Sequence, residues 1–320
     1  MSEPLLFGLG AGLSFVHWDT RSAPFPFLGG RVKPFELTRR LAARTGLRLS
    51  VRETRSARAA LAHLRDGLAT GSPVGLQLDS SLLPYFTSSA PFPGHVVAAT
   101  ALDGDLVHLV DTAQQGGRVS VSLDDVAAAR AARGPMSAPH RSFTLDVPDG
   151  SPLRTGDLVP ALVDAVVTCA REFLDPPIAN VGHRGLRLAA QRLPTWFDRV
   201  HDPARDLVTA GTLVERAGTG GGLFRLVHSE FLADGVERCR GRLPAADVDR
   251  LARGRDLYAR AADGWTRVAG LLEAAGRQLD PRPLQDAGRV LHEVADLETA
   301  AAELLREVGP AGFEPTTAAV

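Results

Sequence analysis

The chain has 320 residues and a formal net charge of −1, with 44% hydrophobic and 23% charged residues. This composition is close to that of average globular proteins, which excludes a disordered tail, a collagen and a coiled-coil rod. The length favours two domains. A net charge near zero argues against non-specific nucleic-acid binding, which needs a basic face.

Two cysteines, Cys169 and Cys239, are too few for a disulfide framework and are typical of a reducing cytosol. No stretch approaches the roughly 20 apolar residues of a membrane span. The N-terminus carries Glu3 and no early Arg or Lys, unlike the positive start of a signal peptide. We therefore expect a cytoplasmic protein without membrane contact. Of 36 basic residues only Lys33 is lysine, which together with abundant Ala and Gly indicates a GC-rich bacterial coding bias.

Residues 1–147 predict a mixed α/β domain. Apolar residues recur at helical spacing over 34–46 and 56–71. Ser122 with Asp125 resembles a capping box that opens a short helix ending near Arg133. Seven runs are β-branched or alternating and are bounded by turn residues, as strands are. They are 13–18, 47–53, 74–79, 95–102, 106–111, 118–123 and 141–147.

Residues 148–157 form the clearest change of composition, rich in Pro, Gly and polar residues, and we predict the domain linker there. Strand signals end beyond it, so residues 158–310 predict a helical domain. The tail, residues 311–320, is expected to be frayed. The runs with a helical period are 159–174, 184–193, 223–243, 245–276 and 282–308.

The segment 94–112 carries the main candidate site. Two predicted strands joined by Asp-Gly form a hairpin, with His95 and Asp111 near its open end. A carboxylate that orients an imidazole base is half of a nucleophilic triad. A two-residue turn at 103–104 puts the two side chains on opposite faces, whereas a longer loop or a bulge puts them on one face. Without that register, they are a structural histidine at a strand start and an aspartate at a strand end.

Further segments resemble the butirosin biosynthesis protein H family. Its N-terminal domain has a papain-like, peptidase-type fold and is followed by a helical domain, so the resemblance implies an α+β papain-like domain at 1–147 and an all-α domain at 158–310. The resemblance covers nearly the whole chain. The segments that carry it are LFGLGAGLSFVHW (6–18), GRVKPFELTRRLAARTGLRL (30–49), LPYF (83–86), the 94–112 hairpin, LPTWF (193–197), VERAGTGGGLFRLVHSEFL (214–232) and DGW (263–265).

The resemblance implies acyl transfer in natural-product biosynthesis. The family's named member moves an aminoacyl group from a carrier-protein thioester to an aminoglycoside amine. This implies an acyl carrier protein and a small-molecule amine as partners, and no bound cofactor beyond the 4'-phosphopantetheine thioester that the carrier presents. In such a mechanism a cysteine thiolate accepts the acyl group, His95 activates thiol and then amine, and Asp111 orients His95.

The sequence departs from the family in its nucleophile. In the family a cysteine follows a histidine upstream of the residues that match 2–10, and residues 1–147 of this chain contain no cysteine. Three explanations are open: the nucleophile precedes Met1, the chain is a variant without it, or the amine attacks the thioester directly with His95 as base. The missing first helix is expected to leave Leu5, Leu6 and Phe7 poorly covered.

Other candidates are weaker. Tyr85 is a candidate for the wall of an acyl pocket. Gly220 and Gly221, at a predicted helix start beside Arg225, are candidates for binding a pantetheine phosphate, although close packing also explains the glycines. The histidines show no metal-ligand spacing, so no metal site is predicted.

The two cysteines lie in helical segments. Cys169 reads as a small buried hydrophobe, and Cys239 has arginine neighbours that could lower its pKa.

Three functions follow. The first is an acyltransferase that moves an acyl group from a carrier-protein thioester to an amine. The second is a papain-like thiol hydrolase or peptidase, which gives the acyl group to water. The third is a catalytically inactive binding or scaffold protein, which the absent cysteine favours.

Overall fold

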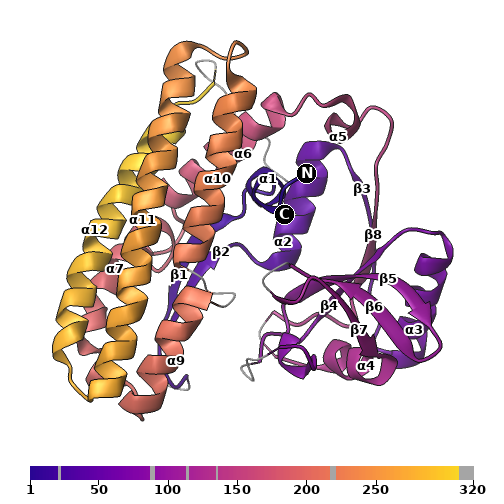
Figure 1. The fold of residues 1–320 in the computed structure, drawn as a ribbon, viewed down its shortest axis with the longest axis horizontal. Helices are drawn as coiled ribbons and strands as arrows, with labels where there is room; N and C mark the ends of the chain where they lie inside the picture. Colours follow the sequence, from indigo (N-terminus) through magenta and orange to yellow (C-terminus); the bar gives the residue numbers. More distant parts are fainter. Residues whose placement is uncertain (21–22, 87–90, 113–114, 135, 217–220, 310–320) are drawn as a thin grey trace. The chain divides into compact units, whose positions relative to one another are not determined.

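A computed structural model describes residues 1–20, 23–86, 91–112, 115–134, 136–216 and 221–309 (Figure 1). The chain divides into two compact units. The sheet unit is Lys33–Thr155, and the helical unit joins Met1–Val32 to the chain from Gly156 onward. An α+β region with an antiparallel sheet, followed by a largely helical region, confirms the predicted fold class.

The division by packing differs in one respect from the division expected along the sequence. The boundary at residues 155 and 156 falls inside the predicted linker 148–157, but a second boundary lies after Val32. Residues 1–32 therefore pack with the helices, although their strand pattern suggested the N-terminal domain. Alternating hydrophobicity indicates that a strand has a buried face but does not specify which element covers it.

The sheet unit is built on six antiparallel strands in the order β3-β8-β4-β5-β6-β7. All six lie within predicted strand segments or differ from them by one residue. The strands are β3 (Arg48–Arg52), β4 (Val74–Leu78), β5 (His95–Asp103), β6 (Leu106–Val110), β7 (Arg118–Ser122) and β8 (Ser142–Asp146), and the helices are α2 (Pro34–Thr45), α3 (Ala57–Ala69), the 3-10 turn η1 (Ser80–Leu82), α4 (Leu123–Ala131) and α5 (Pro152–Thr155).

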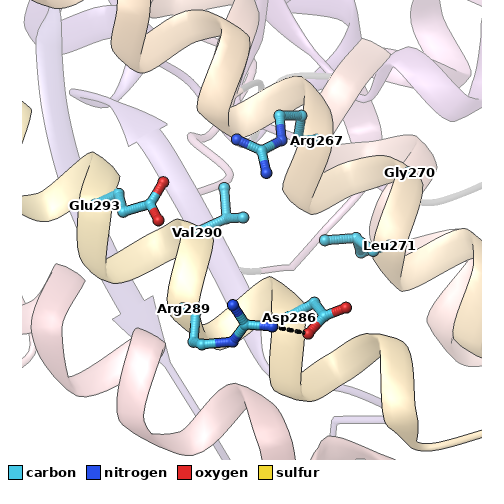
Figure 2. A pocket seen from close by; sticks show the side chains of 7 residues that line it. All are labelled: Arg267, Gly270, Leu271, Asp286, Arg289, Val290 and Glu293. Atoms are coloured by element: carbon cyan, nitrogen blue, oxygen red, sulfur yellow. Dashed lines mark hydrogen bonds and ion pairs between the residues drawn. The ribbon is translucent and has the colours of Figure 1, made fainter.

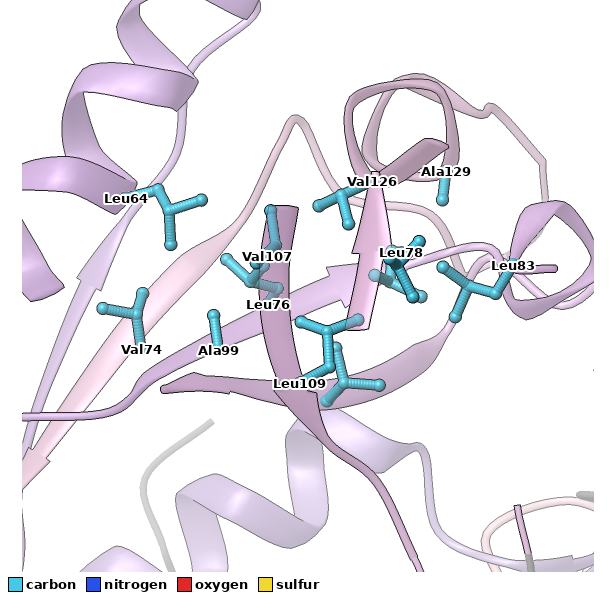
Figure 3. Close-up of a cluster of buried hydrophobic side chains, with 12 residues drawn as sticks. Leu64, Val74, Leu76, Leu78, Leu83, Ala99, Val107, Leu109, Val126 and Ala129 are labelled. Carbon is cyan, nitrogen blue, oxygen red and sulfur yellow. The ribbon is translucent and has the colours of Figure 1, made fainter. Parts of the chain in front are cut away.

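One face of this sheet is covered by α3 and α4. Leu64 from α3 and Val126 and Ala129 from α4 join the inward-facing residues of β4 to β7 in one buried apolar cluster (Figure 3). The start of α4 is fixed by the predicted cap: the Asp125 N–H donates to Ser122 Oγ at 3.0 Å, and the Ser122 hydroxyl donates to the Asp125 carboxylate at 2.7 Å.

The opposite face of the sheet packs against α2. Phe35 of α2 lies 5.5 Å from the ring of Phe143 on β8. Gly75 faces the same ring from β4, and a Cβ there would lie 2.2 Å from it, so only glycine allows the contact. The residues of β4 are buried on both faces, and Gln77 is its one polar residue.

The helical unit is an assembly in which α11 packs against α9, α10 and α12 (Figure 1). The predicted helices are confirmed, while α1, β2 and α9 were not predicted. The elements are α1 (Glu3–Leu9), the two-stranded antiparallel sheet β1 (Leu13–Trp18) and β2 (Phe27–Arg31), α6 (Val159–Leu174), α7 (Gly182–Arg192), the 3-10 turn η3 (Leu193–Thr195), α8 (Trp196–Arg199), α9 (Pro203–Arg216), α10 (Gly221–Cys239), α11 (Ala245–Gln278) and α12 (Arg282–Leu305). No described helix is both long and apolar enough to cross a membrane.

The N-terminal helix α1 corrects one expectation. Leu5 is 1% and Phe7 6% exposed, so the prediction that they lack cover is wrong for these two side chains, while Leu6 is partly buried. The ring of Phe7 stacks on Phe224 of α10 at 5.4 Å. Gly8 lies so close to Phe231 of α10 that a Cβ would overlap its ring, at 2.0 Å. The cover comes from α10, more than 200 residues along the chain, which local sequence patterns do not indicate.

Candidate active site

The β5–β6 hairpin has a tight turn. Asp103 lies opposite Leu106, so the loop consists of Gly104 and Asp105, one residue later than the turn that the sequence suggested. Gly104 has φ of 56°, the left-handed conformation that glycine adopts without strain. With a two-residue turn and no other irregularity, the side chains of His95 and Asp111 would lie on opposite faces of the sheet.

A β-bulge at Thr100 changes that register. The pairing between β5 and β6 shifts by one residue there. Continued beyond the bulge, the register sets Asp111 opposite Val97, the second residue after His95. Side chains two residues apart on a strand share a face, so His95 and Asp111 are diagonal neighbours. The bulge is thus the feature that brings the pair together, as the alternative with a bulge required.

His95 and Asp111 form a hydrogen-bonded pair. His95 Nε2 lies 2.8 Å from Asp111 Oδ2. The Asp111 side chain is fully buried and that of His95 is 12% exposed, so the imidazole closes off the carboxylate and itself reaches solvent. The geometry therefore supports the predicted base-and-orienter arrangement.

The carboxylate of Asp111 is stabilised in its charged form. Burial acts to raise its pKa, but the hydrogen bond and charge of His95, the backbone N–H of Thr112 at 2.7 Å and the Tyr85 hydroxyl together outweigh burial, so the pKa of Asp111 lies below its ordinary value. An ionised Asp111 accepts only, so Nε2 of His95 carries the proton of this bond. Nδ1 of a neutral His95 then has the free lone pair and is the nitrogen available to accept a proton.

Two aromatic residues complete the site. The Tyr85 hydroxyl donates to Asp111 Oδ2 at 2.9 Å, the same oxygen that binds His95. Phe86 sets its ring edge-on to the imidazole, with centroids 5.1 Å apart. Tyr85 was predicted as the wall of an acyl pocket, and its hydroxyl instead holds the carboxylate. The aromatic pair directly after the buried β4 and its 3-10 turn was the only sequence signal for this contact.

The turn that carries these aromatics is held by Asp79, which sequence reasoning missed. This buried carboxylate accepts the N–H of Ser81 at 3.0 Å, the Ser81 hydroxyl at 2.8 Å and the N–H of Phe92 at 2.9 Å. It thus ties the end of β4 to the segment that leads into β5. An aspartate at the end of a buried strand, before two serines, is the signal that could have identified it.

We expect Tyr85→Phe to raise the pKa of Asp111. The Tyr85 hydrogen bond is one of the contributions that hold this pKa down. A depressed carboxyl pKa contributes stability that is present above the unfolded pKa and is lost as the pH falls through the folded one, so part of that contribution should disappear. A 13C titration of the Asp111 carboxyl measures the shift. Tyr258→Phe, which changes the only other tyrosine of the sequence, is the control, and equal midpoints in wild type and Tyr85→Phe would contradict the assignment.

The predicted phosphate site at the glycine-rich segment lies partly outside the described residues. Gly220 lies outside them. Gly221 begins α10, and a Cβ there would lie 2.4 Å from the ring of Trp265. Close packing against Trp265 therefore explains this glycine.

Arg225 is corrected as a substrate-binding residue. It is 0% exposed, and its Nε and one terminal nitrogen donate to the two oxygens of Glu298, each at 2.8 Å. A third bond, 3.2 Å long, reaches the Gly30 carbonyl. The guanidinium is enclosed in the helical unit and satisfied by a carboxylate, so it has a structural role there.

Neither cysteine has the surroundings of a nucleophile. Cys169 is buried in α6 and Cys239 ends α10 at 0% exposure. Burial raises the pKa of the Cys239 thiol, and Asp247 adds to it, which outweighs the lowering effect of Arg242. Arg242 does lower this pKa, as expected of an arginine neighbour, but burial was not considered and reverses the net direction.

Within the described residues, no group of three or more His, Cys, Asp or Glu side chains could hold a metal ion. A surface hollow of about 410 Å³ lies on α11 and α12 and carries charges of both signs, including an ion pair between Arg289 and Asp286 (Figure 2). Leu271 and Val290 also line it. Its lining contains no base or nucleophile comparable to the His95–Asp111 pair, which makes the pair the stronger candidate.

Comparison with known protein families supports the resemblance. Residues 1–112 match the family described as "Butirosin biosynthesis protein H, N-terminal". Residues 124–305 match the "Domain of unknown function (DUF4872)", which covers more than half of the chain. The chain therefore belongs to the DUF4872 family, and it carries in addition a butirosin biosynthesis protein H N-terminal domain at residues 1–112. No curated protein matches it.

The residues described above fall into two different family matches. His95, Asp111 and Tyr85 all lie in the match to the butirosin biosynthesis protein H N-terminal domain. Arg225 and Glu298 lie in the DUF4872 match. Residues 1–112 are thus similar to a butirosin biosynthesis domain, and the link to antibiotic biosynthesis rests on the name of that family alone.

Proposed function

We propose that the chain transfers an acyl group from a carrier-protein thioester to the amine of a small molecule, in the cytoplasm. The observation that carries the proposal is the hydrogen-bonded pair of His95 and Asp111. A buried, ionised carboxylate bonded to one ring nitrogen, on an imidazole whose side chain reaches solvent, is what a general base requires. The name of the family supplies the setting, natural-product biosynthesis.

The reaction that these residues support is direct transfer. The neutral amine attacks the thioester carbonyl carbon, and a new C–N bond forms. Nδ1 of His95 takes the proton that the amine loses, and the resulting imidazolium is stabilised by Asp111. The C–S bond then breaks, and the proton passes from His95 to the leaving thiolate. Direct transfer uses no thiol of the protein, which agrees with the absence of cysteine from the sequence of the sheet unit.

The test is to supply an aminoacyl pantetheine thioester and an aminoglycoside amine and to identify products by mass spectrometry. We expect the amide, and we expect His95→Ala to lower its rate of formation by about two to four orders of magnitude, the usual contribution of a general base. His108→Ala is the matched control, since His108 lies on the neighbouring strand β6 and its ring bonds to the Ser120 hydroxyl of β7 rather than to a carboxylate.

Each outcome decides between the functions. Amide formation that depends on His95 supports the proposal. Release of the free acid without amide assigns the site to a hydrolase. No reaction with either acceptor, or an amide rate that His95→Ala leaves unchanged, contradicts catalysis by this pair and favours a scaffold.

A further inference from the structure

A small pocket lies at the first turn of α2, wholly within the sheet unit. Its volume is about 120 Å³, below the usual 300–1,000 Å³ of sites that enclose a whole small molecule, so it has room for one terminal group. The side chains that line it are those of Lys33, Phe35, Glu36, Gln77, Met136 and Arg141.

This pocket is separate from the His95–Asp111 site. Gln77 lies between Leu76 and Leu78 on β4, and these two leucines belong to the cluster under α3 and α4. Because side chains alternate along a strand, Gln77 faces the α2 side of the sheet. His95 pairs with Leu78 and so faces the other side.

The polar wall of the pocket is already ordered. Arg141 donates to Gln77 Oε1 at 2.7 Å and to Glu53 Oε1 at 2.6 Å, and its guanidinium lies 4.0 Å from the centre of the Phe35 ring. Gln77 in turn donates to the Met136 carbonyl at 2.6 Å. The guanidinium is therefore oriented before a ligand binds. Its other terminal nitrogen makes no bond within the described part of the chain and can still donate.

The uncompensated charge at the pocket is that of Lys33, because an ion pair with Glu53 at 2.6 Å already compensates Arg141. Glu36 is held by Arg40 at 2.9 Å and Arg39 at 3.5 Å, so its negative charge is already paired. Lys33 is exposed and forms no ion pair with the described residues. It is also the only lysine in the chain, and its compact ammonium carries three donors that can rotate to meet an anion.

We propose that this pocket binds the oxyanion end of a small molecule, a phosphate or a carboxylate, between Lys33 and Arg141. The adjoining carbon atoms of that molecule contact Phe35 and Met136. The inference goes beyond acyl transfer and does not rest on it, because it concerns the other face of the sheet.

The single lysine permits a direct test. Lysine labelled with 13C and 15N gives one side-chain signal, that of Lys33. Inorganic phosphate, acetate and chloride are added separately at constant ionic strength, and the Lys33 Cε shift is followed by NMR. We expect a saturating shift with phosphate or acetate and not with chloride. Whichever of phosphate and acetate binds more tightly identifies the oxyanion.

Variants separate the pocket from general surface charge. Arg141→Gln should weaken binding at least tenfold. Arg118→Gln removes an exposed arginine of β7 in the same unit and should leave binding unchanged. Lys33→Gln, at an exposed position that folding tolerates, should also remove saturable binding, measured by 31P line broadening or calorimetry. A shift that does not saturate with either oxyanion, or equal binding by the two arginine variants, overturns the proposal.

Discussion

Glu298→Ala is expected to lower the free energy of unfolding of the helical unit by about 3–5 kcal/mol. The substitution removes the carboxylate that pairs with two of the three donor nitrogens of buried Arg225 and accepts the Trp265 indole N–H at 2.9 Å. An arginine cannot lose its proton to escape burial. The unpaired cation therefore stays in the core, or the surrounding structure opens to hydrate it.

The size of the effect follows from what Glu298 joins. It lies on α12 and binds Arg225 from α10 and Trp265 from α11, while Arg225 also binds Gly30 on β2. Both charged side chains are 0% exposed, so solvent does not screen the pair. The Glu298 carboxylate thus connects three helices and, through Arg225, strand β2.

Denaturant unfolding followed by tryptophan fluorescence measures this prediction. All three tryptophans, at 18, 196 and 265, belong to the helical unit, so the signal reports on that unit. Glu293→Gln removes an exposed carboxylate from the same helix and should change stability by less than about 0.5 kcal/mol.

A double variant separates charge from packing. In Arg225→Met with Glu298→Met, no unpaired charge is left, so the loss should be smaller than in Glu298→Ala alone. If the double variant is the less stable of the two, the cost comes from lost packing and not from an unpaired buried cation, and the predicted cause is wrong.

The strands and helices of the sheet unit could be predicted because their signals are local. Alternation within each strand, helical spacing over 34–46 and the Ser122–Asp125 cap depend on residues close in sequence. The α6 helix, at Val159–Leu174, matches its predicted run residue for residue. Secondary structure in this chain is therefore largely encoded by short-range pattern.

The elements that were not predicted have contacts far away in sequence or unusual local composition. β2 contains Gly29 and Gly30 and follows prolines, which weakens a strand signal. The burial of α1 depends on α10. Arg225 beside a glycine run resembled an anion site because its partner, Glu298, lies 73 residues away and no local pattern connects them.

At the candidate site, too, the sequence did not predict features that depend on residues distant along the chain. The sequence identified both His95 and Asp111, and it also stated the condition for their meeting, a longer loop or a bulge. It could not locate the bulge, because Thr100 looks like an ordinary strand residue. The role of Tyr85 was missed because a hydrogen bond 26 residues apart in sequence depends on the path of the turn between them.

Asp111→Asn is expected to reduce acyl transfer by about two to four orders of magnitude, as much as the loss of His95. The asparagine amide can donate to His95 Nε2, which favours the tautomer with its proton on Nδ1. Nδ1 then carries a hydrogen and has no lone pair for the amine proton. The carbonyl oxygen of the asparagine can still accept the Thr112 N–H, so the fold should persist.

The comparison that decides is between single and double variants. Residues that act as one unit are not additive, so His95→Ala with Asp111→Asn should be no slower than His95→Ala alone. Asp103→Asn, at an exposed position of the same hairpin, is the control and should retain the wild-type rate. Losses in kcat that multiply in the double variant would show that Asp111 acts independently of His95, which contradicts the proposed role of the carboxylate in orienting the base.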